Sequence, residues 1–218
     1  MIRIKICCIA SAEEARLAIE HGASAVGLVA KMPSGPGPIA DDLIRSIAQT
    51  VPPPIGTFLL TSETDIEQIK IHHEKTKTNT IQIVDSITKG TYKDLKDSLP
   101  GIKIVQVIHV IDDQSVEAAI SISKQVDAIL LDSGNPNLSV KELGGTGRVH
   151  NWKLSRLIRE NAKCPVFLAG GLNSGNVRQA IEEVNPFCVD VCSGVRTNGK
   201  LDLVKLANFI KEVEETSR

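Results

Sequence analysis

The feature that most constrains the fold of this chain is an alternation between short apolar runs and longer amphipathic stretches, repeated eight times. The first run, IRIKICCI at residues 2–9, is rich in β-branched residues. It is followed by a helical stretch in which Ala12, Ala15 and Ile19 share one face. Strands that alternate with helices form parallel sheets, because each helix returns the chain to the same edge. The pattern therefore predicts an α/β protein built from eight βα units.

Seven further strand-like runs complete the pattern: AVGLVA (25–30), IGTFLL (55–60), TIQIVD (80–85), KIVQVIHV (103–110), DAILLDS (127–133), PVFLAGG (165–171) and FCVDVCSG (187–194). Eight such units in 218 residues predict a single (βα)8 TIM barrel domain that covers residues 1–218. A doubly wound open sheet is the alternative. The count of eight, and the lack of a glycine-rich dinucleotide loop after the first run, favour the barrel.

Composition and charge narrow the class of protein. A formal net charge of −1 gives no basis for binding nucleic acid or an anionic membrane. No apolar run approaches the roughly 18 residues that span a bilayer. Arg3 and Lys5 interrupt the first apolar stretch, which is unlike a signal peptide. The five cysteines, an odd and widely spread number, indicate reduced thiols and predict a cytoplasmic protein.

Glycine clusters occur in three segments that follow the late strands of the barrel, and the catalytic residues of this fold lie at that end of the strands. They are Gly144, Gly145 and Gly147, then Gly170 and Gly171, and finally Gly194 beside Ser193. Glycine lets backbone N–H groups approach an anion, and the last two loops are the usual phosphate site of such barrels. We expect a phosphate site here, although tight turns alone would explain any single cluster. The long segment 133–147 predicts a loop that covers the ligand.

The adjacent pair Cys7 and Cys8 ends the first strand-like run and admits four interpretations: a metal site, a disulfide, buried small side chains or a reactive thiol. Alternation points the two side chains to opposite faces, which opposes a shared metal ion, and the predicted compartment opposes a disulfide. Cys8 is expected to face the helices as a small buried hydrophobe. Cys7, with Arg3 and Lys5, points into the barrel, where it is either a core residue or a base.

Asp132 favours the second interpretation of Cys7, because it ends the sixth strand-like run at the same end of the barrel. A thiol that acts as a base and a carboxylic acid on opposite sides of a pocket suit an isomerisation that moves protons. A nearby phosphate site indicates a phosphosugar substrate.

Five segments of the chain, KICCIA, AILLDS, GGTGRVHNW, LAGGLNSGNV and VDVCSGV, resemble the phosphoribosylanthranilate isomerases of tryptophan biosynthesis. The resemblance covers nearly the whole chain. It implies a barrel without cofactor or metal that performs an Amadori rearrangement, with Cys7 as general base and Asp132 as general acid. It also implies that Gly145, Gly171, Ser193 and Gly194 bind the substrate phosphate. Lys5 and Asp190 occupy matching positions and are expected to pair inside the barrel or to be purely structural.

The part of the site that would hold the aromatic acid departs from this family. The family carries an arginine for the anthranilate carboxylate in its second βα loop, where this chain reads KMPSGPGPI at residues 31–39. The fourth strand-like run ends in Asp85 instead of Leu-His-Gly, and the fifth has His109 instead of arginine. His109, Lys31 and Arg196 are candidates to restore positive charge around the pocket.

Three functions therefore follow from the sequence. The first is phosphoribosylanthranilate isomerisation. The second is the same aldose–ketose isomerisation of a different phosphosugar amine or sugar phosphate. The third is a phosphate-ligand binding barrel without catalysis, which would tolerate the loss of Cys7 or Asp132. The expected partner is a small phosphosugar, with neither nucleic acid nor membrane, and the expected state is a monomer or a homodimer.

Overall fold

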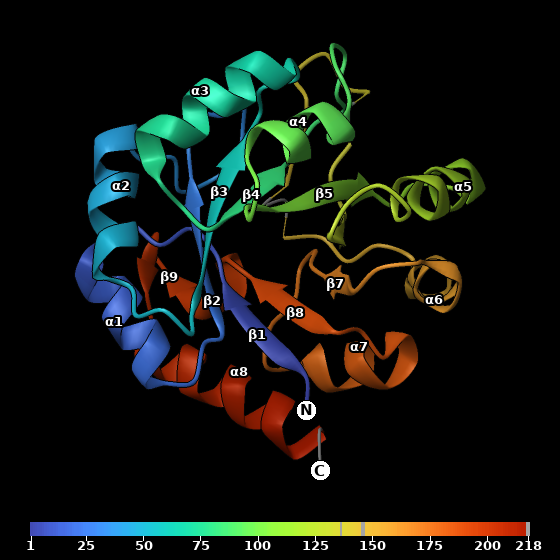
Figure 1. Cartoon of the computed structure of the whole chain (residues 1–218). Helices are drawn as coiled ribbons and strands as arrows, with labels where there is room; N and C mark the ends of the chain where they lie inside the picture. The colour runs from blue at the N-terminus through green and yellow to red at the C-terminus, as the bar shows by residue number, and fades with distance from the viewer. Residues whose placement is uncertain (136, 145–146, 217–218) are drawn as a thin grey trace.

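The structure is a computed structural model that describes residues 1–135, 137–144 and 147–216. Eight parallel strands pair in chain order, and β1 also pairs with β8, so that the sheet closes into a barrel. In the described residues eight helices surround this barrel, and the N-terminus lies near the end of α8 (Figure 1). The predicted (βα)8 barrel is confirmed. We keep the interpretation of one domain, because the first and last strands must meet to close the sheet.

The strands of the barrel are β1 (Arg3–Ile6), β2 (Ala25–Val29), β3 (Gly56–Thr61), β4 (Thr80–Ile83), β5 (Lys103–His109), β6 (Ala128–Asp132), β7 (Val166–Leu168) and β8 (Cys188–Val191). The helices are α1 (Ala12–Glu20), α2 (Asp41–Thr50), α3 (Ile66–Thr76), α4 (Tyr92–Ser98), α5 (Asp113–Ile122), α6 (Trp152–Asn161), α7 (Val177–Val184) and α8 (Leu203–Thr216). A 3-10 turn, η1 (Ser193–Val195), and a small hairpin of β9 (Arg196–Thr197) and β10 (Lys200–Leu201) join β8 to α8.

Side-chain caps begin several of these helices. Ser11 Oγ accepts from the backbone N–H of Glu14 before α1, and Asp112 accepts from Ser115 before α5. Thr91 and Asp94 form a complete capping box before α4. Each cap satisfies a backbone donor that has no partner inside its helix, so polar residues at these positions fix where the helices begin.

The core has two parts that the strand alternation separates. Side chains such as Ile6, Leu59 and Ile129 pack between the barrel and the helices. Phe58, Leu130 and Phe167 fill the barrel interior. Successive residues of a strand point to opposite faces, so strands buried on both sides must be apolar almost throughout. None of the described helices is long and apolar enough to cross a membrane.

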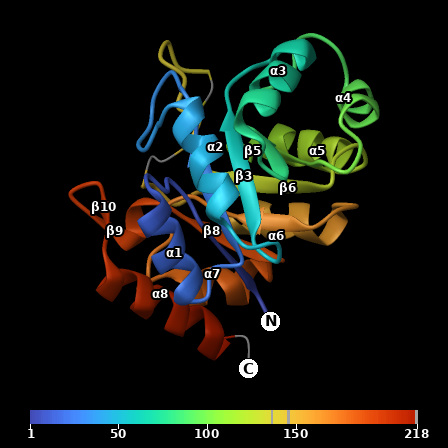
Figure 2. The ribbon, with the colours of Figure 1, turned by 60° about the vertical axis from the view of Figure 1, so that its left-hand side comes forward.

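Two loops meet over one end of the barrel, the end where the strands finish. The loop between β2 and α2, drawn in blue, lies beside the loop between β6 and α6, drawn in yellow (Figure 2). Ser34 Oγ donates to the carbonyl oxygen of Lys141 at 2.5 Å, and Gly35 lies against the carbonyl oxygen of Gly144. The expectation that segment 133–147 covers this end agrees with these contacts in its described residues.

Candidate active site

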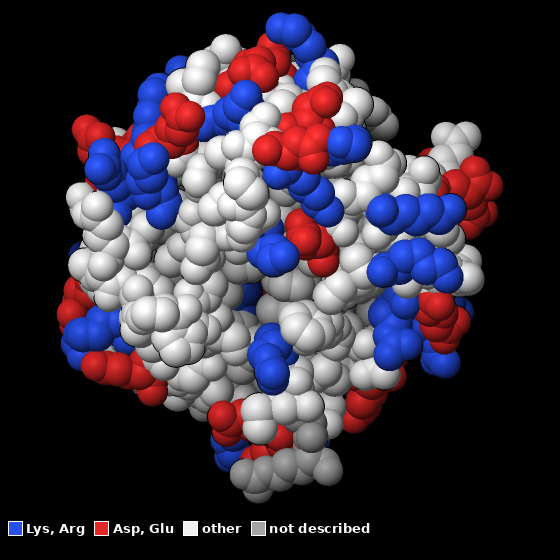
Figure 3. Space-filling view, in the orientation of Figure 1, with Lys and Arg blue, Asp and Glu red and all other residues white. Residues whose placement is uncertain are grey.

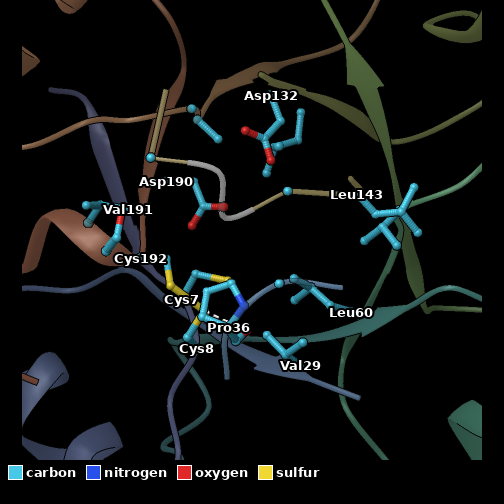
Figure 4. A pocket seen from close by; sticks show the side chains of 18 of the residues that line it. Cys7, Cys8, Val29, Pro36, Leu60, Asp132, Leu143, Asp190, Val191 and Cys192 are labelled. Atoms are coloured by element: carbon cyan, nitrogen blue, oxygen red, sulfur yellow. Dashed lines mark hydrogen bonds between the residues drawn. A yellow bond between two sulfur atoms is a disulfide. The ribbon is translucent and has the colours of Figure 1, made fainter. Parts of the chain in front are cut away.

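A pocket opens at the carboxyl ends of the strands. It forms the hollow near the centre of the face in Figure 3. Cys7 and Asp132 line it from opposite sides, with Asp190 between them (Figure 4). Six apolar side chains line the pocket between these two residues: Val29, Met32, Leu60, Val84, Leu130 and Leu143. The pocket therefore combines a thiol and a carboxyl group with a largely apolar wall.

Cys7 follows β1 directly and is held in place by its backbone. Its N–H donates to the carbonyl oxygen of Val191 at 2.8 Å, which continues the pairing of β1 with β8. The thiol is buried, and burial raises its pKa to about 11, although the positive charge of Lys5 opposes this change. Cys7 is a free cysteine that faces the pocket, as the sequence predicted.

Asp132 is the last residue of β6, and its carboxyl group faces the same pocket. Burial raises the pKa of Asp132, while a hydrogen bond of 2.7 Å from the backbone N–H of Ser133 and the neighbouring His109 oppose the shift. A carboxyl group that keeps its proton to higher pH can donate it, which is the property that a general acid needs.

Lys5 and Asp190 form the buried ion pair that the sequence suggested, with 2.9 Å between Lys5 Nζ and Asp190 Oδ2. Burial favours the neutral lysine, but Asp190 outweighs it, so the pKa of Lys5 is raised. The second oxygen of Asp190, Oδ1, is buried and has no protein partner among the described residues. Gln82 Oε1 is likewise buried and unpaired, and both side chains line the pocket. Gln82 was not predicted as a site residue, because it lies within a strand and belongs to no recognisable motif.

The predicted phosphate-binding residues gather at one side of the pocket. Gly171 and Ser193 line it, and Gly194 follows Ser193 in η1. Within the described part of the chain, the backbone N–H groups of these three residues have no protein acceptor. Gly145, the fourth predicted residue, lies outside the described residues.

Tight packing is a second reason for glycine at this edge. A Cβ at Gly194 would overlap the carbonyl oxygen of Leu172, and one at Gly171 would lie 2.7 Å from the carbonyl carbon of Arg148. Gly171 also has a φ of +63°, which side chains disfavour.

Residues 4–212 match the family model of N-(5'-phosphoribosyl)anthranilate isomerase. The isomerase 2 of Methanosarcina mazei is 36% identical over 211 residues, which covers 96% of this chain and 92% of that protein. The isomerase of Methanocella arvoryzae is 33% identical over 217 residues and covers 99% and 100% of the two chains. The chain belongs to the N-(5'-phosphoribosyl)anthranilate isomerase family.

Solved structures of this family agree with the described fold. The isomerase of Thermotoga maritima shares 30% of its residues and superposes with a TM-score of 0.82, over 99% of this chain and 100% of that one. A phosphoribosylanthranilate isomerase in complex with reduced 1-(o-carboxyphenylamino)-1-deoxyribulose 5-phosphate shares 28% and has a TM-score of 0.80, with the same coverage.

Lys31 and Arg196, two of the residues expected to restore positive charge, lie elsewhere. Lys31 is exposed and lines a separate surface depression with Asp41 and His72. Arg196 is buried and forms an ion pair with Glu14 at 3.0 Å. Its guanidinium also donates to the carbonyl oxygens of Cys8 at 2.5 Å and Cys7 at 3.3 Å. In this family member Arg196 therefore supports the backbone that carries Cys7 instead of facing the pocket.

Asp85 and His109 lie close to the pocket but do not line it. The carboxylate of Asp85 pairs with Lys141, with 2.5 Å between Oδ2 and Nζ. His109 Nε2 is 3.2 Å from the carbonyl oxygen of Val84, and its ring lines a groove beside α4 and α5. Among the described residues that line the central pocket there is no lysine or arginine.

Cys8 corrects two expectations. It does not face the helices but lines the pocket, because its φ of +61° ends β1 at Ile6 and turns the side chain away from the alternation of the strand. It is also not a free thiol, since it forms a disulfide with Cys192, which follows β8. The remaining cysteines, Cys7, Cys164 and Cys188, are free. The described residues contain no cluster of three or more metal-ligating side chains.

Proposed function

We propose that this chain converts N-(5'-phosphoribosyl)anthranilate to 1-(carboxyphenylamino)-1-deoxyribulose 5-phosphate in tryptophan biosynthesis. The observation that carries the proposal is the placement of Cys7 and Asp132 on opposite walls of one pocket (Figure 4), in a chain whose relatives are named for this isomerisation. We also assign the reaction to the cytoplasm, as the sequence predicted, with the chain acting as a monomer or a homodimer.

Asp132 acts as the general acid in the first step. Its proton passes to the ring oxygen of the furanose, the bond between C1′ and this oxygen breaks, and the nitrogen forms a protonated Schiff base with C1′. The raised pKa of Asp132 supports this role, because burial favours the protonated form that a general acid needs.

Cys7 acts as the general base in the second step and removes the proton from C2′. The thiol has a pKa of about 11 in the unliganded pocket. A cationic Schiff base beside it lowers that pKa, because an opposite charge favours the thiolate. A larger fraction of Cys7 is therefore present as the thiolate, the form that can accept a proton, after the acid has acted. The enolamine that forms becomes the ketone when C1′ takes up a proton and the C2′ hydroxyl group releases one. Transfer of a proton from the Cys7 thiol to the Asp132 carboxylate, directly or through water, restores the acid and the base.

Asp190 and Gln82 supply acceptors for the sugar. Asp190 Oδ1 and Gln82 Oε1 are buried, unpaired and on the pocket wall, so each leaves an unsatisfied acceptor unless a ligand donates to it. Hydroxyl groups of the ribose are such donors. Backbone N–H groups of Gly171, Ser193 and Gly194 are proposed to hold the phosphate, with Gly145 as a further candidate.

Lys141 is the cation that we assign to the carboxylate of the aromatic ring. The segment that carries it is fixed against the pocket wall, since Ser34 lines the pocket and donates to the Lys141 carbonyl oxygen. Asp85 holds the Lys141 ammonium group above the ends of the strands. A single lysine makes a point contact, whereas an arginine fork makes two parallel hydrogen bonds. We therefore expect weaker selection for the carboxylate than an arginine would give.

Isomerisation of another phosphosugar amine is the second candidate function, and it is favoured by the absence of arginine from residues 31–39. The two candidates are separated by kinetics with phosphoribosyl amines that carry or lack the ring carboxylate. Preference for the anthranilate compound by a factor of ten or more in kcat/KM supports the first, since one charged contact is worth about this much. Equal or better turnover without the carboxylate supports the second.

A further inference from the structure

Cys8 and Cys192 stand at the edge of the active site, and both line its pocket (Figure 4). Their disulfide joins residues that are 184 positions apart, with 5.9 Å between the Cα atoms, a separation typical of disulfides. Neither residue belongs to the acid–base pair. The bond is nevertheless one residue away from the base Cys7 on one side and one residue away from Ser193 on the other.

The two ends of the bond are held differently by the rest of the protein. On the β1 side, Arg196 donates to the carbonyl oxygens of both Cys7 and Cys8, and Arg196 is itself fixed by Glu14. This end stays in place without the disulfide. On the β8 side, Ser193 is exposed and its backbone N–H has no acceptor in the described chain. The disulfide therefore adds a constraint to the segment that begins the proposed phosphate-binding turn, beside the hydrogen bond of 3.4 Å from the Val195 N–H to the Cys192 carbonyl oxygen.

The two sulfur atoms also differ in access. Cys8 is 5% exposed, whereas Cys192 is only half-buried and faces the open pocket. A small thiolate that enters the pocket reaches Cys192 first. Disulfides that are accessible in this way exchange more readily than those enclosed in a core.

We propose that Cys8 and Cys192 form a reversible redox pair that sets how tightly the active site holds its phosphosugar. When the pair closes, the two thiols lose two protons and two electrons to form the S–S bond. A small-molecule disulfide accepts them and becomes two thiols. When the pair opens, a small thiolate attacks Cys192, Cys8 leaves as a thiol after taking up a proton, and a second thiol releases Cys192.

The open and closed forms are predicted to differ in affinity and not in chemistry. Cys7 and Asp132 do not take part in the exchange, and Arg196 holds the Cys7 segment in both forms. Reduction of the disulfide gives the Cys192–Ser193 segment more conformational freedom. The free-energy cost of ordering this segment then opposes substrate binding. We expect KM for the phosphosugar to rise about three- to tenfold on reduction, with kcat changed by less than about twofold. This kinetic part rests on the proposed function.

The test compares protein incubated with oxidised glutathione and with dithiothreitol, followed by alkylation, digestion and mass spectrometry. The oxidised sample should contain a peptide pair linked through Cys8 and Cys192 and three alkylated cysteines, and the reduced sample should contain five. KM and kcat are then measured for both. Cys192→Ser and Cys8→Gly should show the KM of the reduced protein under both conditions. Cys164→Ser, a matched loss of a thiol that faces away from the pocket, should respond as the parent chain does.

Three results would overturn the proposal: no linked peptide after oxidation, the same KM in both forms, or a Cys192→Ser variant that still responds to dithiothreitol. If neither form turns over the phosphosugar, the proposed function fails instead. The redox pair is then judged by the linked peptide and by the melting temperature, which reduction should lower only in chains that carry both cysteines. The Cys8→Gly variant removes the disulfide but keeps the backbone conformation at residue 8, because glycine adopts the φ of +61° without strain.

Discussion

The two halves of the active site differ in how deeply their polar groups are buried. The half formed by β1, β6, β7 and β8 holds Cys7 and Asp132, the proposed base and acid, in buried positions that backbone hydrogen bonds fix, beside the proposed phosphate site. The half formed by β2 to β4 presents a wall that is apolar apart from Gln82, and the ion pair Lys141–Asp85 lies beside it on loops. An ion pair in each half illustrates this difference in burial. The pair Lys5–Asp190 is 0% and 7% exposed, and the pair Lys141–Asp85 is 47% and 11% exposed. The contrast indicates that the chemistry is fixed by the barrel itself, while the choice of ring substituent is left to loops.

Substitution of Cys7 or Asp132 is the strongest test of this difference between the two halves. Cys7→Ala and Asp132→Asn should each lower kcat by about 10²- to 10⁴-fold, because each removes one proton transfer. KM should change little, since the phosphate-binding and apolar contacts remain. Steady-state kinetics check this, with Cys188→Ala, another buried free thiol that does not line the pocket, as the control. Variants that retain more than a tenth of the activity would show that these residues are not the acid and base.

Removal of the buried cation tests the structural side of the same half. Lys5→Met leaves the carboxylate of Asp190 buried without its partner, and we expect the free energy of unfolding to fall by about 3–5 kcal/mol. Urea denaturation measures this loss. The matched variant in the other half, Lys141→Met, should cost at most about 1 kcal/mol, because Lys141 is largely solvated. Equal losses for the two variants would contradict the contrast.

The loop half is tested by affinity. Lys141→Ala should raise KM for N-(5'-phosphoribosyl)anthranilate by about three- to tenfold with kcat almost unchanged, since it removes one partly solvated charge contact. Lys93→Ala removes an exposed lysine of α4, which pairs with Asp97 away from the pocket, and should have no effect. An unchanged KM for Lys141→Ala would mean that another group meets the carboxylate.

The smallest expected effect is on the pH dependence of stability. Burial raises the pKa of Asp132 above its ordinary value of 3.8, so the folded protein binds this proton more tightly than the unfolded chain does. The stabilising contribution is complete below about pH 3.8 and is lost as pH rises through the folded pKa. Asp132→Asn should therefore unfold at higher denaturant concentration than the parent chain at pH 8, and the difference should shrink at pH 4. Asp97→Asn, an exposed carboxylate, is the control, and a gain that does not depend on pH would refute the explanation.

The sequence was sufficient to predict the elements whose physics is local. Each strand corresponds to an apolar run in the sequence. The late strands are followed by glycines or end in an ionisable side chain. Alternation along β1 indicated that Lys5 and Cys7 point into the barrel. The pairing of Lys5 with Asp190 was left open by the sequence, and it occurs because adjacent β1 and β8 place the two residues in register.

Residues whose positions depend on distant parts of the chain could not be predicted. Cys8 leaves the strand alternation through one positive φ, and its partner Cys192 comes 184 residues later. Arg196 is drawn inward by Glu14 and two backbone carbonyl oxygens, which no local pattern reveals. Lys141 reaches Asp85 across 56 positions because two loops meet over the barrel. Such contacts follow from closure of the barrel, and spacing in the sequence does not report them.

The most direct test of the central claim is the loss of anthranilate fluorescence when purified protein is mixed with freshly made N-(5'-phosphoribosyl)anthranilate, with Cys7→Ala and Asp132→Asn measured alongside. We predict rapid turnover by the parent chain and almost none by either variant. Absence of turnover by the parent chain, or turnover that survives both substitutions, would contradict the assignment of this pocket as the isomerase active site.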